Sequence, residues 1–192
     1  QEKQAFILEA INEHKQSGMY NLAADAEEYA HQRNSTIMNY QKLLYTVSGK
    51  AVPDNYSANY KLCSNFFDRF ITQENQYLLG NGVTLEKDEN KKKLGKKFDQ
   101  QLQKAGRDAL VEGVSFGFWN YDHLESYKLT EFVPLYDEET GALMGGIRFW
   151  QLEYNKPLRA TLFELDGYTD YIKKKNEEIK VLYEKRNYKQ IV

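Results

Sequence analysis

The chain has 192 residues, of which 28% are charged and 14% are aromatic, and only three are proline. This is a globular composition, long enough to bury a core, and it excludes disordered and collagen-like chains. The formal net charge of −2 provides no overall basic field for nucleic acid. The single cysteine, Cys63, excludes a disulfide framework. No apolar stretch approaches the roughly 18 residues of a membrane span.

The first part of the chain shows helical patterns. Residues 4–15 predict an amphipathic helix that ends at Gly18. Its apolar side is formed by Phe6, Ile7, Ala10 and Ile11. A second helix is predicted over residues 21–31, with Asn21 as its N-cap. Residues 46–55 contain glycine and proline and predict a loop.

The clearest helical pattern covers residues 59–79, where apolar side chains return every three or four residues and form one stripe. The stripe consists of Cys63, Phe66, Phe67, Phe70, Ile71, Tyr77 and Leu78. We expect Gly80 to take the left-handed conformation just past this helix, because glycine has no Cβ. Gly82 then lets the chain turn into a short strand at residues 83–85. Gly80 and Gly82 are therefore the predicted hinge.

A further helix is predicted over residues 91–112, ending at Gly113. Its predicted buried face is Leu94, Phe98, Leu102, Ala105 and Ala109. Five lysines would lie opposite that face: Lys91, Lys92, Lys93, Lys96 and Lys97. They form either a solvated helix face or a basic face toward phosphates or an acidic partner. No aromatic residues interleave with these lysines, which argues against a stacking site for single strands.

From residue 114 the pattern changes to that of short strands. Strands are predicted over residues 114–121, 128–136, 147–154, 158–165 and 168–173. Tight turns separate them, at residues 122–123, 137–141, 155–157 and 166–167. Such short connections predict an antiparallel meander, because parallel strands need long crossovers. Residues 176–192 fit a further strand as well as a helix.

The predicted fold class is α+β, with N-terminal helices and a long helix packed on an antiparallel β-meander. We divide the chain into an N-terminal helical segment (1–55), a segment with the long supporting helix, a short strand and the basic helix (56–113), and the meander (114–192). Large aromatic residues are the candidates for the core or for a subunit interface. These are Phe66, Phe67, Phe70, Trp119, Phe149 and Trp150.

The sequence shows no catalytic apparatus. The histidines His14, His31 and His123 are far apart and have no second ligand at metal-binding spacing. Cys63, on an apolar stripe, is typical of a buried small hydrophobe. The acidic run at 137–139 fits a solvated turn, and no nucleophile elbow or phosphate-binding loop is present. We therefore expect a protein that is not an enzyme and that needs neither a metal nor a cofactor.

Several segments carry a likeness to a known family. In chain order they are FITQENQYLLGNGVT (70–84), AGRDALVEGVSFGFWNYD (105–122), LTEFVPLYDEETGALMGGIRFWQ (129–151) and ATLFELDGYTDYIKK (160–174). This series resembles the N-terminal part of portal proteins of tailed bacteriophages, of the type found in long-tailed siphophages. Together with Tyr20 and the Arg33-Asn34 pair, the resemblance covers about residues 20–175.

The resemblance implies a non-enzymatic ring, usually a dodecamer, at one capsid vertex, through whose channel DNA is packaged and ejected. The implied partners are further copies of the chain, the terminase large subunit, the major capsid protein, the scaffolding protein, the head–tail adaptor and double-stranded DNA, with no membrane. The implied location is the virion, and the host cytoplasm during assembly.

This chain would form the outer wing and its supporting helix. Because the family's stem and clip segments are not recognisable in it, we expect it to be a fragment that does not close a ring alone. The alternative is a nucleic-acid-binding accessory or virion-assembly protein that uses the basic face at residues 91–97.

Overall fold

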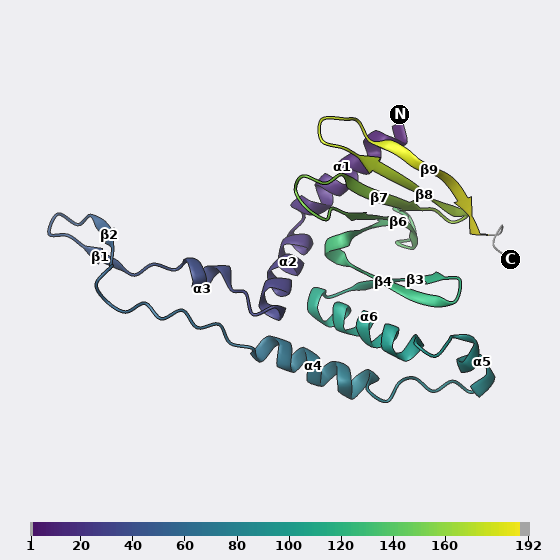
Figure 1. Cartoon of the computed structure of the whole chain (residues 1–192), viewed down its shortest axis with the longest axis horizontal. Coiled ribbons are helices and arrows are strands. Elements are labelled where there is room, and N and C mark those ends of the chain that lie inside the picture. Colours follow the sequence, from purple (N-terminus) through teal and green to yellow (C-terminus); the bar gives the residue numbers. More distant parts are fainter. Residues whose placement is uncertain (1, 189–192) are drawn as a thin grey trace.

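A computed structural model describes residues 2–188 and confirms the α+β fold class (Figure 1). The helices are α1 (Glu2–Gln16), α2 (Gly18–Ala30), α3 (Ser35–Asn39), α4 (Phe66–Leu79), α5 (Asp88–Lys93) and α6 (Phe98–Glu112). The strands are β1 (Leu43–Tyr45), β2 (Ala51–Pro53), β3 (Ser115–Asn120), β4 (His123–Lys128), β5 (Phe132–Tyr136), β6 (Leu143–Trp150), β7 (Leu158–Phe163), β8 (Gly167–Lys173) and β9 (Lys180–Asn187). A 3-10 turn, η1 (Leu129–Glu131), precedes β5. Within the described residues, no helix is both long and apolar enough to cross a membrane.

Strands β5 to β9 form one five-stranded sheet in which every strand pairs antiparallel with the next. The predicted meander is therefore confirmed. The structure also settles the open choice for the C-terminal stretch, because β9 is a strand; residues 189–192 lie outside the described part. A bulge inserts Met144 between two β5–β6 pairs, Leu135 with Gly145 and Tyr136 with Leu143.

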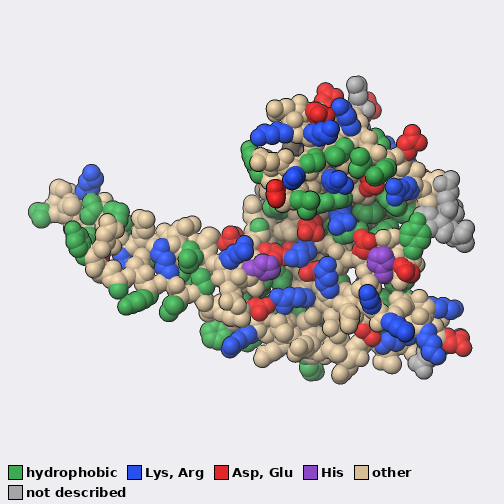
Figure 2. Space-filling model, in the orientation of Figure 1, with side chains coloured by type: hydrophobic (Ala, Val, Ile, Leu, Met, Phe, Trp, Pro, Cys, Tyr) green, Lys and Arg blue, Asp and Glu red, His purple; other side chains and the backbone are tan. Residues whose placement is uncertain are grey.

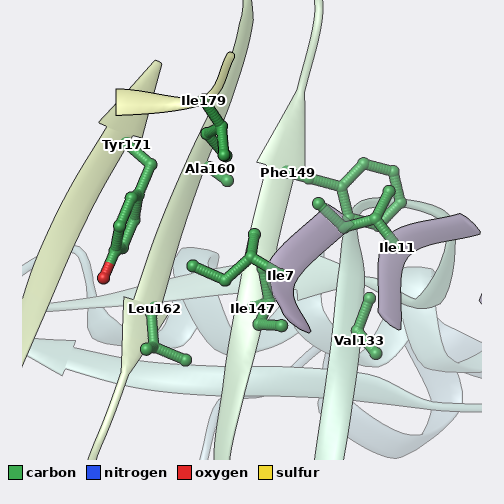
Figure 3. Packing of buried hydrophobic residues seen from close by; sticks show 9 residues of the cluster. All are labelled: Ile7, Ile11, Val133, Ile147, Phe149, Ala160, Leu162, Tyr171 and Ile179. Atoms are coloured by element: carbon green, nitrogen blue, oxygen red, sulfur yellow. The ribbon is translucent and has the colours of Figure 1, made fainter. Parts of the chain in front are cut away.

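Helix α1 covers one face of this sheet (Figures 1 and 3). Ile7 and Ile11 are 0% and 1% exposed. They pack against inward-facing residues of every strand from β5 to β8: Val133, Ile147, Phe149, Ala160, Leu162 and Tyr171. The first helix therefore contributes to the core of the meander, and the division of the chain into three segments stays a prediction.

The β3–β4 hairpin packs on the opposite face of the sheet. The rings of Phe116 and Phe132 stack with centroids 4.6 Å apart, and those of Phe118 and Phe163 are 4.8 Å apart. Ala23 of α2 closes this second cluster. Strand β4 was not predicted, because its partly polar sequence HLESYK lacks a clear alternation.

A third cluster joins α2, α4 and α6 through Ala30, Ile71 and Val111. Helix α4 begins at Phe66 and not near residue 59, and it packs on α6 and α2 instead of on the meander. The prediction that this long helix packs on the meander is therefore wrong. The apolar set of the helix is split: Phe67 and Ile71 face inward, whereas Phe66 and Phe70 are 62% and 65% exposed.

Three boundaries also differ from the prediction. Gly18 begins α2 instead of ending α1, because the Ser17 hydroxyl accepts a 3.1 Å hydrogen bond from the Tyr20 N–H and caps α2. Gly95, with φ +86°, separates α5 from α6, so residues 91–112 are not one helix. The predicted stop at Gly113 is confirmed, since it takes the left-handed conformation after α6.

We predict that Ile7→Ala lowers the free energy of unfolding by about 2–5 kcal/mol, because removing the larger side chain leaves a cavity between α1 and the sheet. Urea denaturation followed by circular dichroism measures this change. The neighbouring Phe6→Ala is the matched control, since Phe6 is 49% exposed; its cost should stay below about 1 kcal/mol. Equal losses in the two variants would contradict the role assigned to α1.

Candidate functional site

Of the two glycines of the predicted hinge, only Gly82 takes the left-handed conformation. Gly82 has φ +71°, and a Cβ there would meet the Asp99 carboxylate, so a larger residue would be strained and would displace that side chain. Gly80 has φ −60° and ψ −33° and continues the helical conformation. The left-handed residue therefore comes two positions later than predicted. Residues 83–85, predicted as a strand, have no regular structure.

The ammonium group of Lys91 is bound by other groups of the same chain. Its Nζ lies 3.0 Å from Asp99 Oδ2 and donates a 2.6 Å hydrogen bond to the Val83 carbonyl. Asp99 Oδ1 accepts from the Val83 N–H at 3.2 Å. The lysine holds the pKa of Asp99 below its ordinary value. Lys91 thus fastens the segment after Gly82 to the start of α6. Whether it also contacts phosphates or a partner stays a prediction.

The other four lysines remain exposed on the last turn of α5 and the connection to α6. We call them the basic turn; its members are Lys92, Lys93, Lys96 and Lys97. Among the side chains that the structure describes, a set that does not include Asp88, no ion pair to these four lysines is found. Figure 2 shows Lys and Arg side chains gathered over α5. They lie on a short helix and a loop, not on the predicted face opposite Leu94 and Phe98.

Aromatic side chains lie beside the basic turn. The rings of Phe98 and Trp119 are 6.2 Å apart, and Gly95 lies against the Asp122 carbonyl. Trp119 is 40% exposed. It borders a pocket of about 510 Å³ whose aromatic lining is Phe118, Trp119, Tyr121, Tyr168 and Tyr188. Local sequence could not predict this pocket beside the lysines, because its five aromatic lining residues lie more than twenty positions from the basic turn.

The other predicted aromatic residues have different positions. Phe149 is 4% exposed and belongs to the core under α1. Trp150 is half-buried on the other side of β6, where the Arg148 guanidinium lies 4.7 Å from its ring centroid. Phe66 and Phe70 lie outside the core of the chain, and whether they form a subunit interface stays a prediction.

Residues 38–62 form an arm that projects from the body (Figure 1). The β1–β2 hairpin forms its tip. Two extended legs are braced by hydrogen bonds from the Lys61 Nζ to the Met38 carbonyl, from the Asn59 Nδ2 to the Tyr40 carbonyl (3.2 Å), and from the Lys42 Nζ to the Ala58 carbonyl (2.6 Å). The exposed apolar side chains of the arm are Met38, Tyr40, Leu43, Leu44, Tyr45, Val47, Tyr56, Tyr60 and Leu62.

A buried polar cluster joins α2, α6 and β4. Glu27 pairs with Lys128, and Glu112, 7% exposed, accepts hydrogen bonds of 2.9 Å from both the N–H and the hydroxyl of Thr130. Burial raises the pKa of Glu112 to about 7, and the neighbouring Glu27 acts in the same direction. This raised pKa would suit a general acid. Glu112 is buried, however, and both of its carboxylate oxygens accept hydrogen bonds from Thr130, which is typical of a structural carboxylate.

The histidines lie apart, as predicted. His14 Nε2 is 2.7 Å from the Leu129 carbonyl, His31 lies 3.6 Å from Glu27, and His123 lies 2.8 Å from Asp122. Between residues 2 and 188, no three His, Cys, Asp or Glu side chains lie close enough together to hold a metal ion. Cys63 is half-buried in an extended segment before α4.

Comparison with known proteins found no protein-family model and no curated sequence that matches this chain.

We predict that Glu112→Gln weakens the pH dependence of stability between pH 4.5 and 7. The folded pKa of Glu112, about 7, lies above its ordinary value of 4.5, so the folded state binds this proton more tightly. Its contribution is complete below pH 4.5 and is lost as the pH rises to 7. The difference in unfolding free energy, variant minus wild type, should therefore be larger at pH 8 than at pH 4.5. Urea denaturation across this range measures the effect.

Other groups act differently. Because the pKa of Glu27 is lowered, its contribution to the free energy of unfolding is lost only as the pH falls. The pKa of His123 is raised, but His123 titrates in both proteins, so its effect cancels in the comparison. The control is Glu138→Gln, in the exposed turn after β5. A pH profile of Glu112→Gln that parallels the wild type would show that Glu112 is not the titrating group.

Proposed function

We propose that this chain is a structural subunit of a self-assembling ring, of the portal type of tailed bacteriophages, in which it forms part of the outer wing. The arm carries this proposal. Nine exposed apolar side chains lie along it, and within the described residues none of the hydrophobic clusters includes them. A monomeric protein rarely exposes so many large apolar side chains on one short segment, which is typical of association.

The positions of the resembling segments support the same proposal. The first covers the end of α4 and the turn at Gly82, and the second covers the passage from α6 into β3. The third contains β5, the acidic turn and β6, and the fourth contains the end of β7 and all of β8. Each segment thus spans a junction between elements, where local geometry restricts the sequence most. Under this proposal the partners are the capsid, scaffold, terminase and tail proteins, and the protein is not an enzyme.

We expect the protein expressed from its complete gene to form closed rings of about twelve copies, the number implied by the resemblance. Negative-stain microscopy shows the rings, and mass photometry gives their mass. A protein that is strictly monomeric at micromolar concentration would contradict the proposal. A terminase gene and a capsid gene beside this one would support it independently.

A second candidate function is binding of nucleic acid, in an accessory or assembly protein. The specific observation is that the basic turn lies beside Trp119 and Tyr121, which are 40% and 62% exposed. Lysines attract the phosphate backbone and aromatic faces stack on unpaired bases. The structure thus supplies the aromatic residues whose absence from the local sequence argued against this function.

If the second function holds, neutralising the basic turn by four Lys→Gln changes should weaken DNA binding uniformly across sequences. For duplex DNA, the dependence of log K on log salt should fall in magnitude by up to about 3.6, since each phosphate contact contributes about 0.9. Fluorescence anisotropy at several salt concentrations measures both. The matched control neutralises four lysines near the distant β8–β9 and β6–β7 turns: Lys156, Lys173, Lys174 and Lys175. Equal effects of the two variants would rule out a specific role of the basic turn.

A further inference from the structure

Helix α4 has two apolar faces. Phe67 and Ile71 face α2 and α6, which is the single stripe that a surface helix needs. A second stripe runs along the outer side, where Phe66, Phe70 and Tyr77 are spaced i, i+4 and i+11 and are 62%, 65% and 89% exposed. Leu78, 59% exposed, follows Ile71 by seven positions and lies in line with the inward-facing residues near the end of the helix. We call Phe66, Phe70 and Tyr77 the outer stripe.

The arm of the same chain does not cover the outer stripe. Both legs of the arm start at the body, one after α3 and the other before α4, and the β1–β2 tip points away from α4 (Figures 1 and 2). The internal hydrogen bonds tie the two legs of the arm to each other. The described chain therefore carries two apolar surfaces that do not meet each other within one molecule.

The arm exposes an apolar area comparable with one side of a standard interface, whereas the apolar area of the outer stripe is smaller, so polar neighbours of the stripe must contribute to the contact. The nine apolar side chains of the arm expose on the order of 1,000 Å², if a large side chain contributes about 150–250 Å² when fully exposed. A stable interface needs about 800 Å² from each partner. The bracing hydrogen bonds also order the arm before binding, which reduces the entropy lost on association.

We propose that the arm of one copy docks on the outer stripe of a second copy. The contact is heterologous, because the two surfaces differ and lie on different parts of the chain, and such contacts repeat into rings or filaments. Pairing of two arms is disfavoured by charge, since each arm carries Lys42, Lys50 and Lys61 against Asp54. This inference rests on the proposed self-assembling function and names the contact that joins neighbouring subunits.

A mixing experiment with the 192-residue chain tests this pairing. The arm variant is Tyr45→Asp/Tyr60→Asp, and the stripe variant is Phe70→Glu/Tyr77→Glu; all four side chains are at least 65% exposed. Sedimentation velocity should show concentration-dependent association of the wild type and at least about 30-fold weaker association of each variant alone, as for interface hot spots. An equimolar mixture should form a one-to-one dimer, because one intact arm and one intact stripe remain.

Each alternative gives a different result. A stripe variant that still self-associates indicates arm–arm pairing, an arm variant that still self-associates indicates stripe–stripe pairing, and both overturn the inference. A wild type that is monomeric at about 100 μM, far above the Kd of standard interfaces, also overturns it. Tyr154→Glu, at an 85% exposed aromatic residue of the β6–β7 turn, is the control and should associate like the wild type. Far-ultraviolet circular dichroism confirms that the variants fold.

The inference and the proposed function can fail separately. If the protein from the complete gene still forms rings when it carries the arm changes, the docking inference is wrong and the ring proposal stands. If the mixing experiment succeeds but the same protein forms only open filaments or dimers, the docking inference stands and the portal proposal is wrong.

Discussion

The packing of α2 is the contact on which the rest of the structure depends. Ala23, Glu27 and Ala30 lie on one side of this helix, and each joins α2 to a different neighbour. Ala23 packs in the cluster under the β3–β4 hairpin, and Ala30 packs against α4 and α6. Between them Glu27 pairs with Lys128. Because a partly buried ion pair is costly when one partner is displaced, α2 has one rotational setting, which fixes the two clusters relative to each other.

Polar contacts then fix α4 against α6. The Asn75 Nδ2 donates to the Gln103 carbonyl at 3.0 Å, and the Gln103 Nε2 donates to the Leu79 carbonyl at 2.9 Å. Arg107 pairs with Asp68 at 2.6 Å. These bonds set the rotation of α4 about its axis. Phe67 and Ile71 can therefore face only inward, and the aromatic residues one position before each of them must face water in the single chain.

The sequence allowed the meander to be predicted because its strands alternate and its turns are short, as at the Asp166-Gly167 hairpin. It allowed much less of the candidate site to be predicted. The helical spacing of apolar residues does not tell which of two adjacent stripes on α4 faces the rest of the protein. The role of Lys91 depends on its ion pair with Asp99, which forms only in the folded structure. The pocket beside Trp119 likewise joins residues from β3, β8 and the C-terminal end of the described chain. Local patterns carry no information about such contacts.

The arm and the basic turn lie at opposite ends of the molecule (Figure 1). This separation decides how the two proposed functions relate. Association through the arm and the outer stripe would use the surface on one side of α4 and leave Lys92, Lys93, Lys96 and Lys97 exposed in every subunit. A ring would then repeat the basic turn around its axis, and weak phosphate contacts of single subunits would add through multivalency. Of the two proposed functions, self-assembly would therefore be the primary one. It would turn the modest positive charge of one subunit into a continuous ring of charge, whereas nucleic-acid binding by itself gives no reason for the apolar arm.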